Sequence, residues 1–170
     1  MEISPFIQKL PKVELHLHIE GTLEPELKFK LAERNGIQLP QSTPEEVRAT
    51  YNFNDLASFL AVYYDGMNVL RTAEDFYDLA IAYLTKAADQ NVRYVEMFFD
   101  PQTHTDRGIA FATVINGLKR ACADAKDKFG ISSQLIMCFL RHLSEEVAFK
   151  TLEQALPYKD RIIGVGLDSS

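Results

Sequence analysis

The chain has 170 residues, of which 46% are hydrophobic and 25% are charged, and its net charge is −6 at pH 7. This length and composition exclude disordered, collagen-like and disulfide-scaffold proteins, and they predict one domain or part of a larger one. Acidic residues outnumber Lys and Arg by 24 to 18, and the basic residues are not clustered. We therefore expect no binding to nucleic acid, which requires a concentrated positive charge.

Other features of the sequence favour a cytoplasmic location. Cys122 and Cys138 lie in apolar contexts without CxxC spacing, so we expect buried free thiols in a reducing compartment. The N-terminal residues lack the charged and apolar regions of a signal peptide. No apolar run approaches the roughly 18 residues that a membrane span requires, so we expect no membrane partner.

Hydrophobic patterning predicts four strands that alternate with helices. The first strand, residues 13–19, alternates with a period of two, with its apolar residues on one face. Its polar residues are expected together on the other face: Glu14, His16 and His18. The remaining strands are predicted over residues 92–99, 134–140 and 161–168.

Capping residues mark the predicted helices between these strands. Thr22 is expected to begin the first helix, and Thr43 and Thr72 are expected to cap two later ones. Further helices are predicted from residue 54, over 110–129 and over 144–156, while the segment after the second strand is expected to form a loop.

This order of elements predicts an α/β fold with parallel strands and right-handed crossovers. Four strands cannot close an eight-stranded barrel, so two architectures remain open. One is a complete open sheet, and the other is the first half of a (β/α)₈ barrel, about four β/α units with extra helices. In both architectures ligands bind at the carboxyl ends of the strands.

The tripeptide His16-Leu-His18 is the sharpest chemical signal. Alternate residues of a strand project to the same side, so both imidazoles can reach one metal ion. Two polar residues on a half-buried strand are the alternative interpretation. Glu20 follows, and three roles stay open for it: a third metal ligand, a substrate contact, or an acid that stabilises the start of the next helix.

The other polar residues near the strand ends carry weaker signals. Glu96 is expected to be buried with a partner or to point into a polar barrel interior. His104 and His142 are expected at the surface or in hydrogen bonds rather than on a metal, and Arg141 in a salt bridge or at an anion. Asp168 follows the fourth strand, where site residues collect, or it caps the next turn.

Four segments together resemble the adenosine/adenine deaminase family of the amidohydrolase superfamily. They are residues 10–25, 94–108, 141–146 and 166–170. The second and fourth are closest to the adenine-specific subgroup. The resemblance extends over essentially the whole sequence and implies that residues 1–170 form the N-terminal half of a single TIM-barrel deaminase domain.

The resemblance also implies one zinc ion, Zn²⁺, with His16 and His18 as the metal ligands from the first strand. The remaining ligands and the catalytic general-acid Glu are expected downstream of Ser170, so activity of the 170 residues alone is doubtful. Glu20, Phe59, Leu60 and Asp168 match substrate-binding positions. Phe59 and Leu60 would cover the pocket, although ordinary core packing explains their helical spacing equally well.

The implied reaction is zinc-dependent hydrolytic deamination of adenine to hypoxanthine and ammonia, with a small-molecule purine as the substrate. Glu20 stands where adenosine deaminases carry Asp, so a longer acid is expected to favour the free base. Adenosine deaminase and a non-catalytic α/β module that binds a metal or small ligand are the alternatives. Homo-oligomerisation, or packing of a truncated chain against a partner, stays open.

Overall fold

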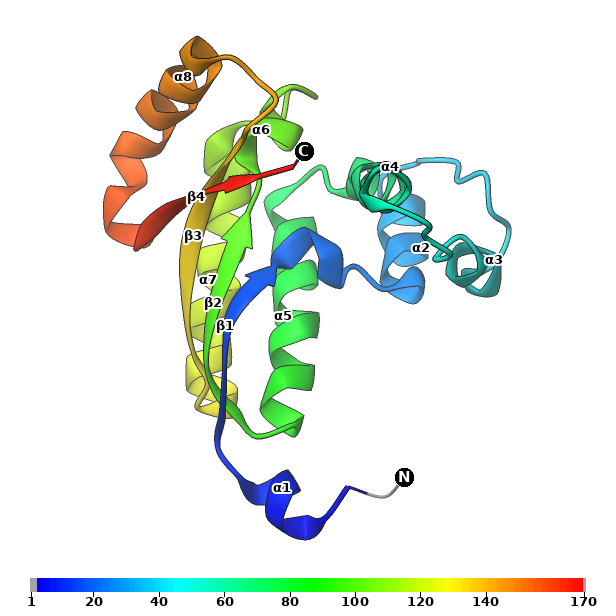
Figure 1. Ribbon diagram of the computed structural model, residues 1–170, viewed down its shortest axis with the longest axis vertical. Coiled ribbons are helices and arrows are strands. Elements are labelled where there is room, and N and C mark those ends of the chain that lie inside the picture. The colour runs from blue at the N-terminus through cyan, green and yellow to red at the C-terminus, as the bar shows by residue number, and fades with distance from the viewer. Residues whose placement is uncertain (1–2, 170) are drawn as a thin grey trace.

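The computed structural model describes residues 3–169, in which one four-stranded sheet forms the centre (Figure 1). The strands are β1 (Lys12–His18), β2 (Val92–Phe99), β3 (Ser132–Leu140) and β4 (Gly164–Asp168). Their order in the sheet is their order in the sequence, and each described pairing is parallel. The predicted alternation of parallel strands and crossover helices is therefore confirmed.

Three crossover helices each lead into the next strand of the sheet: α5 (Ala73–Asp89), α7 (Phe111–Phe129) and α8 (Glu145–Ala155). The last continues into a 3₁₀ helix over Leu156–Arg161. They lie on the same side of the sheet (Figure 1). The hydrophobic core fills the space between sheet and helices and includes Phe76, Leu79, Val95, Met97, Phe99, Val114, Leu118, Leu135 and Met137. The opposite face of the sheet is uncovered within residues 3–169, and Val13 on it is 62% exposed.

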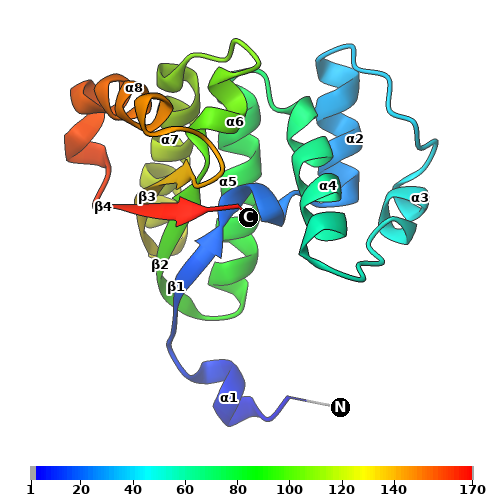
Figure 2. The same cartoon turned by 45° about the horizontal axis from the view of Figure 1, so that its top comes forward.

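Further helices lie outside this layer (Figure 2). The helices α2 (Pro25–Arg34), α3 (Pro44–Ala49) and α4 (Leu56–Gly66) group beside the carboxyl end of β1, whereas α1 (Pro5–Lys9) projects from its amino end. The first long helix begins at Pro25 instead of after Thr22, because Ile19–Thr22 form a 3₁₀ turn. The side chain of Asp55, rather than Asn54, caps α4.

Asp75 shows why α5 begins where it does. The helix is capped by Thr72, and the buried Asp75 carboxylate accepts hydrogen bonds from the Thr72 and Arg71 main-chain N–H groups at 2.8 and 3.0 Å. Asn35 and Arg34 donate to it from α2 and its C-cap, each at 2.9 Å. Burial alone would raise the pKa of Asp75, but these donors outweigh it and lower the pKa. The same carboxylate thus caps the start of α5 and links it to the end of α2.

Tight packing of α7 against α5 depends on Gly117. A β-carbon at this position would lie 2.3 Å from the Ala73 carbonyl oxygen and 2.7 Å from Phe76 Cβ. At the far end of α7, Gly130 has φ of 69° and closes the helix directly after residue 129, where the predicted helix ends. Asn91, after α5, is also in the left-handed conformation, with φ of 61°.

The predicted two-faced alternation of the first strand is wrong in detail. The register of β1 on β2 shifts between Glu14 and Leu17, which is a β-bulge. Glu14 accepts a hydrogen bond from Tyr83 of α5 on the helix side, and Leu15 is exposed. Glu14 therefore does not share a face with His16 and His18. Because a bulge inserts one extra residue, the side chains before it lie on the opposite faces from those that a regular alternation predicts.

No helix among residues 3–169 has the length and apolar character needed to cross a membrane.

Candidate functional site

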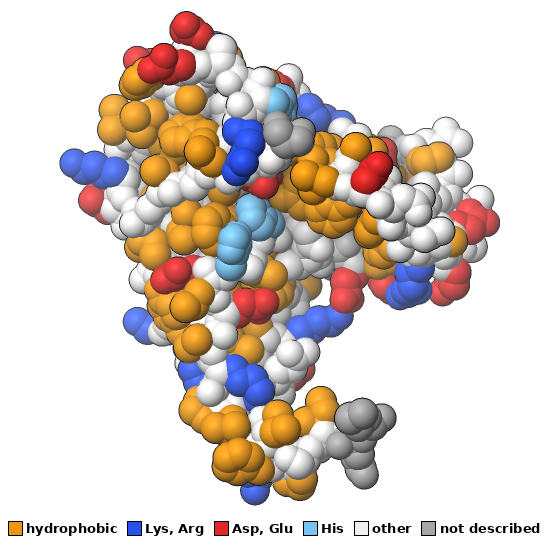
Figure 3. Space-filling model, in the orientation of Figure 1, with side chains coloured by type: hydrophobic (Ala, Val, Ile, Leu, Met, Phe, Trp, Pro, Cys, Tyr) orange, Lys and Arg blue, Asp and Glu red, His pale blue; other side chains and the backbone are white. Residues whose placement is uncertain are grey.

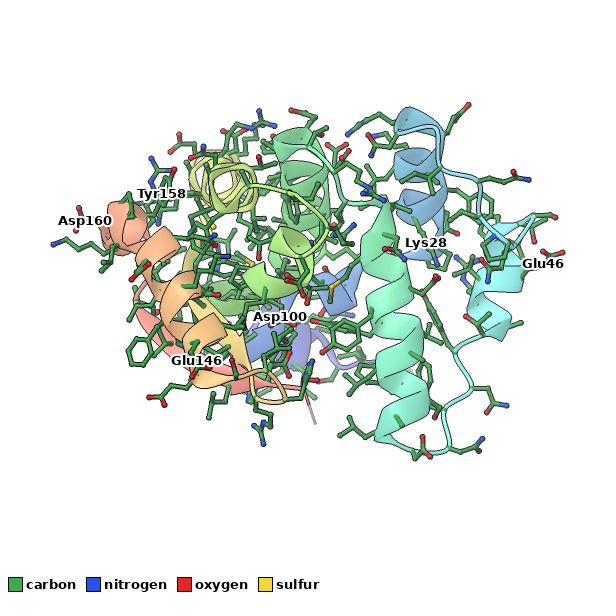
Figure 4. The ribbon with its side chains drawn as sticks, turned by 90° about the horizontal axis from the view of Figure 1, so that it is seen from above. Lys28, Glu46, Asp100, Glu146, Tyr158 and Asp160 are labelled. Atoms are coloured by element: carbon green, nitrogen blue, oxygen red, sulfur yellow. The ribbon has the colours of Figure 1, made fainter. Side chains whose placement is uncertain are left out.

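Polar side chains gather where β1 to β4 end, on the side of the sheet that faces α4. Figure 4 looks down on this end and places Asp100 between the sheet and α4. His18 Nδ1 lies 3.3 Å from Asp168 Oδ2, which joins the ends of the first and fourth strands. His18, Asp100 and Cys138 also offer ligand atoms that all lie within 4.8 Å of one another. Residues far apart in the sequence thus form one cluster.

His16 and His18 lie side by side on the uncovered face of the sheet. Their ring centroids are 5.4 Å apart, and Phe98 of β2 packs against both, with centroids at 4.7 and 5.2 Å. His16 is exposed and His18 is half-buried. Histidine side chains occupy the centre of this face in the space-filling view (Figure 3). Phe98 supports the two rings from one side and leaves their other side accessible.

The cluster contains donors that suit a divalent metal. Imidazole nitrogen and carboxylate oxygen are typical ligands of Zn²⁺. The hydrogen bond to Asp168 raises the pKa of His18 against the effect of burial, and it turns Nδ1 of the ring toward the carboxylate. A carboxylate on one ring nitrogen orients the other nitrogen for metal binding. The residues therefore fit a zinc ion held by His16 and His18, with Asp168 behind His18.

The two aspartates of the cluster have opposite electrostatic environments. The hydrogen bond from His18 holds the pKa of Asp168 well below its usual range. Burial, together with the negative charge of Glu20, raises the pKa of Asp100 strongly, and Asp100 is fully buried. Tyr63 of α4 donates its hydroxyl proton to Asp100 Oδ2 at 3.2 Å. The surroundings thus favour the ionised form of Asp168 and disfavour that of Asp100.

Glu20 lies just after β1 and is buried, with 3% of its surface exposed. Its Oε1 accepts a hydrogen bond from the Asp100 main-chain N–H at 3.0 Å, and His104 Nε2 lies 3.1 Å from the same oxygen. Arg107 contacts the other ring nitrogen of His104 at 2.8 Å. Within residues 3–169, Glu20 Oε2 and Asp100 Oδ1 have no hydrogen-bond partner. Unpaired buried carboxyl oxygens are costly and are often completed by a ligand.

A short helix that the sequence pattern does not predict positions part of this cluster. The expected loop after the second strand instead contains α6 (Pro101–Thr105), which begins with proline directly after Asp100. Gln102 of α6 accepts a hydrogen bond from the Leu140 main-chain N–H at 2.6 Å and so ties α6 to β3. His104, two residues further along, is buried, so the hydrogen-bonding alternative expected for it is confirmed and the surface one is wrong. A single proline-led turn is too short for helical periodicity to reveal.

A cavity of about 760 Å³ adjoins the cluster. Its walls come from the 3₁₀ turn after β1, from α2 to α5 and from the segment between α3 and α4, and they include Glu20, Tyr51, Phe53, Phe59, Tyr63 and Tyr83. Phe59 is 39% exposed and stacks on Tyr63 with ring centroids 5.7 Å apart. An aromatic wall with one buried carboxylate suits a flat, polar-edged ligand.

The remaining predicted residues lie in different surroundings. Leu60 is half-buried on α4 and is not among the described residues that line the cavity. Glu96 is half-buried on the open face and accepts a hydrogen bond from Tyr94 at 2.9 Å. Arg141 is exposed and donates to the Leu167 carbonyl at 3.4 Å instead of forming a salt bridge within residues 3–169. His142 is exposed as well.

The two cysteines are buried free thiols, as the sequence predicts. Cys122 lies in α7 against the core. Cys138 lies beside the acid cluster, where burial raises the pKa of its thiol well above the usual range.

The family model and two similar proteins that match this chain are all deaminases. The family described as "Adenosine deaminase" matches residues 11–170. An adenine deaminase of Acinetobacter baylyi is 65% identical over 170 residues, which are 100% of this chain and 51% of that protein. An uncharacterised deaminase of Schizosaccharomyces pombe is 63% identical over 169 residues, 99% of this chain and 50% of that protein. The chain spans about half the length of these relatives.

Solved structures confirm the predicted fold class. An adenine deaminase from Arthrobacter aurescens superposes with a TM-score of 0.91 at 52% identity, over 94% of this chain and 49% of that one. An amidohydrolase from Burkholderia ambifaria with bound Zn superposes with a TM-score of 0.86 at 26% identity, over 100% of this chain and 48% of that one. The four β/α units form a half-barrel of the amidohydrolase type, and the chain belongs to the adenosine deaminase family.

Proposed function

We propose that this chain is the N-terminal half of a single TIM-barrel domain that deaminates adenine to hypoxanthine and ammonia. The observation that carries the proposal is the convergence of His16, His18 and Asp168 beside a buried Glu20 at the carboxyl ends of the strands. Identity of 60% or more to proteins named adenine deaminase supports adenine over adenosine as the substrate. A metabolic enzyme with free thiols belongs in the cytoplasm.

One zinc ion would be held by His16 and His18 together with ligands from the second half of the barrel. When bound, zinc supplies a Lewis acid that makes a water molecule nucleophilic at neutral pH. Asp168 orients the His18 ring, and Phe98 supports both imidazoles from one side. These contacts fix the ring positions before the metal arrives, which reduces the entropic cost of binding it.

The purine would lie between the metal ligands and α4, where Glu20, Phe59, Leu60 and Asp168 are its proposed contacts. Glu20 Oε2 is a free acceptor for an N–H group of the base. Phe59 and Tyr63 offer aromatic surface that excludes water from the ring. Burial and the negative charge of Glu20 raise the pKa of Asp100, which disfavours a second negative charge beside the substrate.

The proposed activity is tested with purified, zinc-loaded protein that contains this chain joined to the second half of the barrel. We expect adenine to lose its ultraviolet absorbance as hypoxanthine forms, with equimolar release of ammonia. Adenosine should react far more slowly. A preference for adenosine would show that the substrate assignment is wrong. A protein that binds zinc but is inactive on both purines would favour the non-catalytic module.

Shortening Glu20 is expected to weaken discrimination between the two purines. The substitution Glu20→Asp keeps the charge but opens space of about one methylene group, where a ribose could begin to enter. We expect the ratio of kcat/KM for adenine to that for adenosine to fall by about 10-fold or more, the effect of one methylene in a fitted pocket. An unchanged ratio in steady-state assays of both substrates would show that Glu20 does not set specificity.

A further inference from the structure

Three side chains in contact, Arg107, His104 and Glu20, form a chain that connects the residues at and after α6 with the 3₁₀ turn after β1. His104 is fully buried, with Phe76 packed edge-on against its ring at a centroid distance of 4.7 Å. One ring nitrogen, Nε2, lies 3.1 Å from Glu20 Oε1, and the other, Nδ1, lies 2.8 Å from the Arg107 guanidinium. Both polar atoms of the imidazole are therefore used, and neither contacts solvent.

The guanidinium at the end of this chain is itself held in place. Arg107 donates from Nε to the Thr103 carbonyl at 3.1 Å, and from its two amino groups toward the carbonyls of Asn68 and Leu70 at 3.4 and 3.5 Å. Burial lowers the pKa of Arg107 to about 10, so it remains charged at neutral pH. These carbonyls come from the segment that follows α4 and from α6, so the cation joins two elements of the site.

The chemistry of arginine determines the direction of every hydrogen bond in the chain. A guanidinium has donors only, so Nδ1 of His104 must accept. The ring proton is then on Nε2, which donates to Glu20 Oε1. The Asp100 main-chain N–H donates to the same oxygen at 3.0 Å. Two donors thus fix one oxygen of the carboxylate and leave Oε2 as its only free acceptor among the described residues.

We propose that His104 and Arg107 are positioning residues that hold Glu20 with Oε2 presented to the purine, where it accepts a hydrogen bond from a ring N–H of the free base. The inference rests on the proposed function and adds two residues to it. Glu20 lies within the 3₁₀ turn Ile19–Thr22, and its two-carbon stem has several rotamers, of which the two donors to Oε1 select one. Fixing one rotamer before binding lowers the entropic cost of the substrate contact. The positive charge of Arg107 at the far end of the chain also stabilises a carboxylate that is otherwise buried.

The first test concerns the tautomer and needs neither a variant nor activity. In the ¹⁵N-labelled protein that contains this chain joined to the second half of the barrel, long-range ¹H–¹⁵N spectra at neutral pH are expected to show His104 protonated at Nε2 and unprotonated at Nδ1. His142, which is exposed, supplies the reference signals of a histidine outside the cluster. Protonation of His104 at Nδ1, with Nε2 bare, would overturn the proposal, because the ring could then not donate to Glu20.

The second test is a double-substitution cycle in the zinc-loaded, full-length deaminase. His104→Leu is expected to raise KM for adenine by between about 10-fold and 100-fold, the value of a hydrogen bond to a charged group, with little change in kcat. His104→Gln can still donate to Glu20 and is expected to recover most of the lost affinity. Adding His104→Leu to the Glu20→Gln variant should raise KM for adenine by much less than His104→Leu raises it in the wild-type protein, because the ring acts through the carboxylate.

Independent outcomes separate a failure of this inference from a failure of the proposed function. If the wild-type protein does not act on adenine, the proposed function fails, and the tautomer still decides whether the three side chains are arranged as stated. If wild type is active and the His104 and Glu20 effects multiply, the positioning role is wrong. His142→Gln is the matched control and should leave both kinetic constants unchanged. Zinc content and thermal unfolding identify any variant that has lost the fold, in which case His104→Gln decides the result.

Discussion

Replacing His18 with alanine is expected to abolish zinc binding and to lower kcat of the deaminase by roughly a thousandfold, because a bound metal contributes several kcal/mol of transition-state stabilisation. The substitution removes a proposed ligand and also the hydrogen-bond partner of Asp168, which lies 3.3 Å from Nδ1. The Asp168 carboxylate would then lose its contact with β1. Elemental analysis of dialysed protein and steady-state assays measure the two effects.

His142→Ala is the control for this experiment, since His142 is an exposed histidine on the turn after β3. It should keep full zinc content and activity. Retention of stoichiometric zinc by an active His18→Ala variant would show that the metal is bound elsewhere. Retention of zinc with loss of activity would place His18 in catalysis rather than in metal binding.

Introducing valine at Gly117 is expected to prevent α5 and α7 from packing and to cost well over the approximately 3 kcal/mol typical of an overpacked core. Even one β-carbon would lie 2.3 Å from the Ala73 carbonyl oxygen, and the clash involves main-chain atoms that cannot rotate away. The crossover helices would have to separate, and the carboxyl end of β2, which Asp100 follows, would move with them. Equilibrium unfolding in urea, followed by circular dichroism, gives the loss of stability.

Gly66→Ala is the matched control, because Gly66 also lies in a helix but has room for a methyl group. A β-carbon at Gly66 would meet Leu23 at 3.8 Å, an ordinary van der Waals contact. We expect this variant to be as stable as wild type or about 0.5 kcal/mol more stable, through reduced freedom of the unfolded chain. Equal destabilisation by both substitutions would contradict the importance of close packing at Gly117.

The local order of strands and helices could be predicted from the sequence because its signals are short-range. Thr72 caps α5, Asn91 and Gly130 end helices in the left-handed conformation, and β2 occupies the predicted residues. Each of these signals depends on neighbours within about one helical turn. The metal-ligand candidates could be predicted for the same reason, because the spacing of His16 and His18 is a local feature of the sequence.

The parts of the site that the sequence does not reveal depend on tertiary contacts. The bulge in β1 arises from pairing with β2, and it moves Glu14 to the helix side of the sheet, where Tyr83 donates to it. The role of His104 depends on Glu20, which is 84 residues away in the sequence. No periodicity within one segment reports on such a distant partner, whereas buried polar groups that satisfy each other become visible once the chain is folded.

Anomalous diffraction at the zinc absorption edge, from crystals of the zinc-loaded protein, tests the central claim most directly. The account predicts a peak about 2.1 Å from one ring nitrogen of each of His16 and His18, on the open face of the sheet beside Asp168. A peak that contacts neither imidazole, or no peak at this end of the sheet in protein that deaminates adenine, would contradict it.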